Sequence, residues 1–147
     1  ADSTANGNAG LKGGDTAGTA GRIGNAQWFD GNQDYIDCGS GPSLDMDLPR
    51  RISAWIRPDA VSYYGGVVSK DTGKFSPYSY MMTLYADTLY SHDGAGWHNS
   101  SGIPVSTAKW YQVVFETPGD DHIYFSINGR SPGPQRSANS RWKLPRR

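Results

Sequence analysis

The chain has 147 residues with 14 basic and 14 acidic side chains, so its formal net charge is zero and its pI is about 7.1. This balance gives no global preference for nucleic acid or for an anionic membrane surface. No apolar run approaches the roughly 18 residues of a membrane-spanning helix, and the single cysteine, Cys38, excludes an intramolecular disulfide. The 19 glycines and 9 prolines indicate many short elements joined by turns, which favours one all-β domain.

Residues 1–24 are mostly Gly, Ala, Asn, Thr and Ser, with almost no large apolar side chain. Such a segment buries too little surface to offset the entropy lost on ordering, so we expect it to lie as a loop over the body of the domain or to be partly mobile. The candidate strands that follow are bounded by turn residues. They lie at 26–30, 34–38, 51–57, 66–70, 78–85, 88–92, 109–117 and 121–128.

Apolar residues occupy every second position in two of these segments, as expected for half-buried strands. They are Ile52, Ala54 and Ile56 in 51–57, and Ile123, Phe125 and Ile127 in 121–127. Asn128-Gly129 is the strongest hairpin signal, because a type I′ turn needs a positive φ at both central residues. No segment shows sustained helical periodicity. The sequence therefore predicts a two-sheet antiparallel β-sandwich.

The composition changes after Arg130. Ser131-Pro132-Gly133-Pro134 is expected to break any returning strand, and residues 136–147 carry five basic side chains and Trp142. We therefore divide the chain into a domain at 1–130 and a basic, Pro- and Arg-rich C-terminal tail at 131–147.

Five segments combine a half-buried strand with aromatic residues and turn chemistry. They are Gly24-Asn25-Ala26-Gln27-Trp28-Phe29-Asp30-Gly31, Asp34-Tyr35-Ile36, Ile52-Ser53-Ala54-Trp55-Ile56-Arg57-Pro58, Trp110-Tyr111-Gln112-Val113-Val114-Phe115 and Ile123-Tyr124-Phe125-Ser126-Ile127-Asn128-Gly129. Together they resemble the laminin-G-like domains of the concanavalin A-like lectin/glucanase superfamily. The resemblance implies a secreted jelly roll over roughly residues 1–130 that lacks the usual first and last strands.

A sandwich that lacks its end strands has unpaired sheet edges, and such edges recruit other chains. We expect the chain to pair edge to edge, or to swap strands, in a homodimer. The alternative is that residues 131–147 form an irregular covering segment and that the chain is monomeric.

Glycosidases need two carboxyl groups that flank the scissile bond, and the glucanases of the superfamily place closely spaced Glu and Asp residues on one strand. This chain has one glutamate, Glu116, and no Glu-x-Asp pattern. Its close acidic pairs, Asp45/Asp47 and Asp120/Asp121, have the sequence context of turns or strand starts. We therefore predict that the chain is not an enzyme, unless one of two pairs, Asp45 with Asp47 or Glu116 with Asp120, faces one cleft about 5–9 Å apart.

Five Trp and nine Tyr exceed what a neutral sandwich of this size must bury. Sugar rings stack their C–H faces on aromatic rings, while Asn and Asp side chains match the hydroxyl groups. Two clusters, 62–66 and 90–99, combine these residue types between strands. The candidate carbohydrate-binding residues are Tyr63, Tyr64, Tyr90, Asp93, Trp97 and Asn99.

Other aromatic residues have a structural interpretation. Trp28, Trp55 and Trp110 lie inside strand patterns, so we expect them in the core or packed against a sheet.

Laminin-G-like modules often hold one calcium ion at the rim of the sandwich, so the resemblance makes Ca²⁺ the candidate cofactor. Calcium takes several oxygen ligands. Asp30-Gly31-Asn32-Gln33-Asp34 clusters such oxygens around a tight turn and resembles the family's Phe-Asp-Gly-x-x-Asp-Tyr segment, which makes Asp30, Asn32 and Asp34 the candidate ligands. The alternative is an Asx turn, in which the carboxylates accept hydrogen bonds from their own backbone.

We therefore expect a noncatalytic, lectin-like module that binds carbohydrate for polysaccharide attachment or adhesion. Nothing in the sequence indicates nucleic-acid binding or membrane insertion. Two alternatives stay open: a protein-interaction or structural β-sandwich module, and a truncated domain fragment without independent activity.

Overall fold

The computed structural model describes residues 2–61, 64–70, 80–92, 97–99, 102–120 and 122–136. In these residues the chain forms twelve strands and one 3₁₀ turn, η1 (Pro42–Leu44), so the prediction of an all-β fold is confirmed. The chain divides into two compact units, Ala1–Asp45 and Met46–Arg147. The described residues contain no helix with the length and apolar character needed to cross a membrane.

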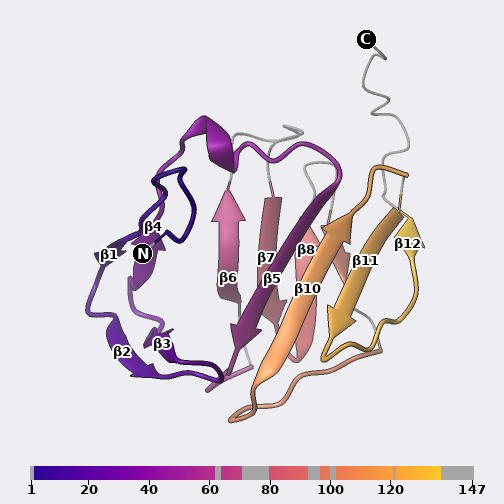
Figure 1. Cartoon of the computed structure of the whole chain (residues 1–147). Helices are drawn as coiled ribbons and strands as arrows, with labels where there is room; N and C mark the ends of the chain where they lie inside the picture. The colour runs from indigo at the N-terminus through magenta and orange to yellow at the C-terminus, as the bar shows by residue number, and fades with distance from the viewer. Residues whose placement is uncertain are drawn as a thin grey trace. The chain divides into compact units, whose positions relative to one another are not determined.

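The N-terminal unit contains two small antiparallel sheets (Figure 1). β1 (Leu11–Gly13) pairs with β4 (Tyr35–Asp37), and β2 (Ala17–Ala20) pairs with β3 (Asn25–Trp28). Gly13 lies opposite Tyr35, and the Tyr35 ring fills the space that a Cβ at residue 13 would occupy. Only glycine therefore lets the tyrosine ring lie over this strand.

The expectation of a loop over residues 1–24 is wrong, because β1 and β2 lie in that range. All four residues of β2 are exposed, and no described residue of the N-terminal unit is buried. These strands pair through backbone groups, which small side chains do not hinder. Because neither face of β1 or β2 is buried, the sequence of these strands carries no alternating apolar pattern that would reveal them.

The C-terminal unit contains two four-stranded antiparallel sheets (Figure 1). We name them the β10 sheet, with strand order β12-β11-β10-β5, and the β7 sheet, with strand order β6-β7-β8-β9. The strands of the β10 sheet are β5 (Arg50–Ile56), β10 (Tyr111–Thr117), β11 (His122–Ile127) and β12 (Gln135–Arg136). Those of the β7 sheet are β6 (Gly65–Lys70), β7 (Tyr80–Tyr85), β8 (Thr88–His92) and β9 (Trp97–Asn99).

One face of each four-stranded sheet contributes side chains to a single apolar core. Phe115 of β10 and Phe125 of β11 are cross-strand partners whose ring centroids lie 5.6 Å apart. The alternation predicted for 51–57 and 121–127 is confirmed, because its apolar positions form part of this core or pack against it. The buried members of the core are Met82, Leu84, Leu89, Val105, Val113, Phe115, Ile123, Phe125 and Ile127.

The predicted turn at Asn128-Gly129 is also confirmed, because both residues have positive φ, 51° and 76°. The N–H of Ile127 donates to the carbonyl of Arg130, and the N–H of Arg130 donates to that of Ile127. Asn128 further ties this turn to β10, since its side-chain oxygen accepts the N–H of Gln112 at 2.9 Å. The chain then returns as β12, although Pro132 and Pro134 were expected to break a returning strand.

Two of the tryptophans expected in the core or packed against a sheet lie outside the core and are partly exposed. Trp55 is 39% exposed because it alternates with Ala54 and Ile56, which pack against the core, and so faces away from it. Trp28 is 46% exposed and belongs to the N-terminal unit, none of whose described residues is buried.

Candidate functional site

Three tyrosines gather on the face of the β7 sheet that points away from the core. The rings of Tyr64 and Tyr85 are stacked, with centroids 4.4 Å apart and an interplanar angle of 28°. Tyr90 meets Tyr85 edge to face, with centroids 6.1 Å apart at 72°. We name Tyr64, Tyr85 and Tyr90 the tyrosine patch. Offset-stacked and edge-to-face contacts of this kind stabilise aromatic clusters beyond the area that they bury.

The register of the β7 sheet brings these rings together. Gly65 pairs with Leu84, so the preceding Tyr64 lies beside the following Tyr85. Thr83 pairs with Tyr90, which places Tyr90 diagonally across from Tyr85 on the same face. Leu84 and Leu89 alternate with the tyrosines and are buried in the core. The core therefore fixes which face carries the patch.

The tyrosines differ in how much of each ring meets solvent. Tyr64 is 64% exposed and Tyr85 is 41% exposed, whereas Tyr90 is half-buried. Thr83, on the same face, is only 4% exposed, and its hydroxyl donates to the carbonyl of Gly65 at 2.9 Å. This bond ties β6 to β7 next to the residues that carry the stacked pair. The patch thus offers exposed aromatic faces on a fixed support.

The predicted carbohydrate-binding residues are distributed unevenly over the described structure. Tyr64 and Tyr90 come together in the patch, whereas Tyr63 and Asp93 lie outside the described residues. Trp97 and Asn99 belong to β9, whose backbone pairing sets Trp97 opposite His92 and Asn99 opposite Tyr90.

Tyr85 is the functional candidate that sequence analysis missed. Part of the sequence signal for the hairpin that places Tyr85 near Tyr90 was present, since 78–85 and 88–92 were both predicted as strands with only two residues between them. A two-residue connection fixes the pairing of Tyr85 with Thr88 and of Thr83 with Tyr90. Ala86, however, is not a usual turn residue, although it adopts a positive φ of 51°. The pattern therefore did not indicate a tight hairpin.

The predicted calcium segment forms a compact acidic group in the N-terminal unit. One oxygen from each of Asp15, Asp30 and Asp34 lies within 4.8 Å of the others. Asp34 accepts the N–H of Asp15 at 2.9 Å and the N–H of Asp30 at 2.8 Å, one on each carboxylate oxygen. Asp30 accepts the N–H of Asn32 at 2.7 Å, so the Asx-turn alternative is confirmed for this residue.

These hydrogen bonds lower the pKa of the Asp34 carboxyl group. The N–H of Asp30 stabilises the carboxylate most, desolvation opposes it, and the N–H of Asp15 adds a smaller stabilisation, so the pKa of Asp34 lies below its usual value of 3.8. The Asp34 carboxylate therefore stays ionised under mildly acidic conditions and can act as an oxygen ligand to a metal ion. The acidic group contains the two predicted carboxylate ligands, Asp30 and Asp34, and adds Asp15 to them.

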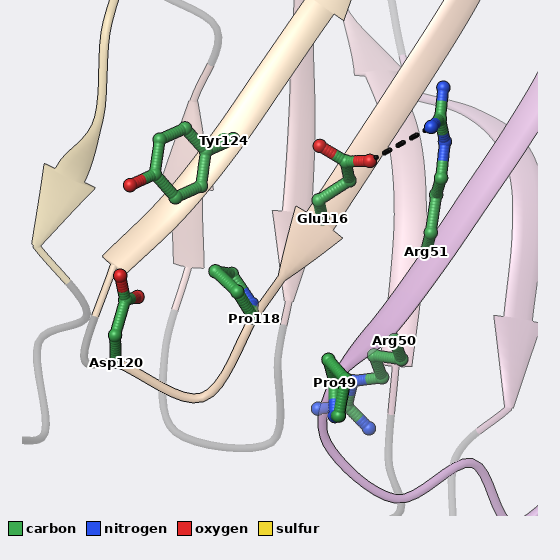
Figure 2. Close-up of a pocket in the computed structure, with 7 residues that line it drawn as sticks. All are labelled: Pro49, Arg50, Arg51, Glu116, Pro118, Asp120 and Tyr124. Atoms are coloured by element: carbon green, nitrogen blue, oxygen red, sulfur yellow. Dashed lines mark ion pairs between the residues drawn. The ribbon is translucent and has the colours of Figure 1, made fainter.

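A cleft with a volume of about 540 Å³ lies at one end of the β10 sheet (Figure 2). Glu116 and Asp120 both line it, whereas Asp45 and Asp47 do not. Glu116 forms an ion pair with Arg51 at 3.1 Å. Asp120 accepts the backbone N–H of His122 at 3.1 Å, and its carboxylate lies 3.5 Å from the Nδ1 atom of that residue. Asp120 thus lies in the predicted turn and Glu116 is paired with a cation, but the two carboxylates share one cleft, so the enzyme alternative stays open for this pair.

Comparisons with protein-family models, with curated proteins and with solved structures found no match for this chain.

Proposed function

We propose that this protein is a noncatalytic carbohydrate-binding module, built as a laminin-G-like, concanavalin A-like jelly-roll sandwich and secreted. The observation that carries the proposal is the tyrosine patch, in which Tyr64 and Tyr85 are stacked and solvent-exposed on the face of the β7 sheet opposite the core. Exposed aromatic rings held on a rigid sheet are suited to stacking against the apolar C–H face of a pyranose ring.

Recognition of hydroxyl groups would come from polar groups around the patch. Tyr90 and Tyr85 carry hydroxyl groups of their own, and Thr88 lies opposite Tyr85 in the sheet. Tyr63, Asp93, Trp97 and Asn99 complete the proposed ligand-binding set on the basis of their sequence context. A surface patch of this type favours a segment of a polysaccharide over an enclosed monosaccharide, and attachment or adhesion is the corresponding role.

Calcium is the cofactor that we propose for the N-terminal unit. Three carboxylate oxygens within 4.8 Å of one another match the hard-oxygen coordination that calcium prefers, and extracellular calcium modules work at about 10⁻⁴–10⁻³ M. Asp30 and Asp34 would supply ligands, with Asp15 in addition to the predicted Asn32. The bound ion would neutralise the clustered carboxylates and hold the turns that follow β1 and β3.

The test is binding of the full chain to a broad glycan and polysaccharide array in millimolar calcium and again in EDTA. We expect binding that Tyr85→Ala weakens, with Trp55→Ala as the matched control because Trp55 is an exposed aromatic residue on the other sheet. Loss of binding in EDTA, and its loss in Asp34→Asn, would assign the calcium a supporting role. No binding by folded, monodisperse protein would overturn the proposal.

The second candidate function is protein interaction through an exposed sheet edge. Within the described residues, β5 ends the β10 sheet and β6 ends the β7 sheet. β5 has seven residues, which gives it a long row of backbone groups along its outer edge. Such an edge favours the homodimer expected from the sequence.

Light scattering at micromolar concentration tests this second function. We expect the mass of a dimer for the natural chain and that of a monomer for Ser53→Lys, because a charge on an exposed position of an edge strand opposes pairing. A monomeric mass for the natural chain contradicts it.

A further inference from the structure

The cleft at the end of the β10 sheet is assembled from two chain segments far apart in the sequence. Pro49 and Arg51, at the start of β5, line one side of the cleft. Pro118 and Asp120, in the turn between β10 and β11, line the other (Figure 2). Gly119 has a φ of 97°, a conformation that other residues rarely adopt, and a Cβ there would lie 3.6 Å from the Leu48 Cβ. The turn thus lies close to the segment that leads into β5.

Strand register sets the polar groups of the cleft in one row. Glu116 pairs with Arg51 of β5 on one side and with Tyr124 of β11 on the other. The three side chains therefore share the outward face of the sheet, and the Arg51 guanidinium lies 3.1 Å from the Glu116 carboxylate. Tyr124 is half-buried, so its ring is held in place more firmly than that of a fully exposed tyrosine.

Arg50 also lines the cleft, and it is 5% exposed. Its Nε donates to the Thr117 hydroxyl at 3.2 Å, and its guanidinium lies 6.0 Å from the centre of the Tyr80 ring. Arg50 therefore supports the start of β5 and the end of β10, the two strand ends that carry the cleft.

The chemistry of the lining suits a neutral polyhydroxylated ligand. Glu116 and Asp120 contribute two negative charges, matched by the accessible Arg51 and by Arg50, which is only 5% exposed, so the formal charge of the lining is zero. A charged ligand would find no net complementary charge there. Carboxylates accept hydrogen bonds, a guanidinium donates them and the tyrosine hydroxyl does both, which matches vicinal hydroxyl groups.

The walls of the cleft have a complementary apolar character. The rings of Pro49, Pro118 and Tyr124 offer flat or compact C–H surfaces beside these polar groups. The volume of about 540 Å³ lies within the range of about 300–1,000 Å³ of small-molecule sites. The cleft therefore combines a stacking surface with balanced donors and acceptors, which are the two requirements for binding a sugar ring.

We propose that the cleft formed by the start of β5 and the β10–β11 turn is a second saccharide-binding subsite, separate from the tyrosine patch and selective for uncharged sugars. This second proposal shares only the class of ligand, a saccharide, with the proposed function. Its residues lie on the β10 sheet, whereas the tyrosine patch lies on the β7 sheet. Tyr124 provides the stacking surface, and Asp120, Glu116 and Arg51 bind hydroxyl groups.

The experiment is a ¹H–¹⁵N NMR titration of the full chain with four neutral hexasaccharides, namely gluco-, manno-, xylo- and galacto-oligomers, and with a galacturonic acid hexamer. We expect at least one neutral oligomer to shift the amides of residues 116–124. Tyr124→Ala should weaken this binding about three- to tenfold, as expected for one stacked ring. Tyr124→Phe should retain most of it, and Ser53→Ala is the matched control on the same outward face.

Two further variants separate this subsite from the patch and from effects on folding. Asp120→Asn keeps the size of the side chain and an oxygen that accepts the His122 N–H, so the fold should persist while cleft binding falls. Tyr85→Ala should leave the shifts at 116–124 unchanged, whereas it weakens binding at the patch. Shifts at the patch alone would overturn the second subsite and keep the proposed function. Shifts at 116–124 that persist unchanged in both Tyr124→Ala and Asp120→Asn, or a preference for the acidic oligomer, would also overturn it.

Discussion

Tyr64 and Tyr85 stack with ring centroids 4.4 Å apart, although one residue precedes β6 and the other ends β7. Their pairing depends on the register Gly65–Leu84, which is anchored by the bond from the Thr83 hydroxyl to the Gly65 carbonyl. The stack leaves both rings exposed to solvent. An exposed, stacked aromatic pair keeps apolar surface in contact with water, which is unfavourable. A ligand that covers this surface would remove that unfavourable contact.

The first prediction concerns Tyr85. Replacing Tyr85 with alanine removes the partner that orients Tyr64, so binding to the best glycan of the array should weaken about three- to tenfold. Tyr85→Phe keeps the stack and should bind nearly as well as the natural chain. Isothermal titration calorimetry with that glycan is the measurement. Equal affinity of the alanine and phenylalanine variants would exclude the stack from recognition.

The second prediction concerns the turn that follows β11. Asn128 has a φ of 51° and its side chain accepts the Gln112 N–H, so Asn128→Ala loses a hydrogen bond and strains the backbone. We expect the free energy of unfolding to fall by about 2 kcal/mol, of which Asn128→Gly should recover about half because glycine tolerates positive φ. Urea denaturation measures both variants. Equal stability of Asn128→Ala and Asn128→Gly would show that the backbone strain at residue 128 is negligible.

The third prediction concerns the core. Phe115 is fully buried against Phe125, so Phe115→Ala should lower the free energy of unfolding by about 3–5 kcal/mol. Gln112→Ala, on the exposed face of the same strand, should change it by less than about 0.5 kcal/mol. Urea denaturation of the two variants makes the comparison, and Phe115→Leu provides a milder change if the alanine variant does not fold. Similar effects at both positions would contradict the assignment of faces in β10.

The fourth prediction concerns acid stability. The N–H of Asp30 lowers the pKa of Asp34 in the folded chain below its usual value of 3.8. The unfolded chain therefore binds this proton first as the pH falls, so the stabilisation is complete above about pH 4 and is lost as the pH falls through the lowered folded pKa.

A ¹³C titration of the Asp34 carboxyl group should accordingly give a midpoint below 3.8. Asp34→Asn should be less stable than the natural chain at neutral pH, because the amide group offers one acceptor to two N–H donors, and the difference should shrink in acid. Asp37→Asn is a matched change of charge in the same unit, where the carboxylate accepts a single N–H from Gly39. A midpoint at or above 3.8 would show that the bonds to Asp34 do not form in solution.

Local patterns in the sequence were sufficient for much of the C-terminal unit. The alternating apolar residues in 51–57 and 121–127 predicted β5 and β11 together with their core faces, and Asn128-Gly129 predicted the turn. These features depend on neighbours a few residues apart, because the side chains of a strand alternate and a turn is set by its own φ angles. The same logic gave the Asx turn at Asp30 as one of two alternatives.

The sites, in contrast, depend on which segments pair and in which register. The tyrosine patch needs the register that sets Tyr64 beside Tyr85, and the acidic group needs β1 and β4 to pair so that Asp15 reaches Asp34. The cleft needs Glu116 between Arg51 and Tyr124. Register is a relation between distant segments, and sliding one strand by a single residue would reverse every face. The sequence by itself therefore determined the all-β class, the core faces of the best-patterned strands and the chemistry of the candidate residues, whereas only the tertiary structure decided which of those residues meet.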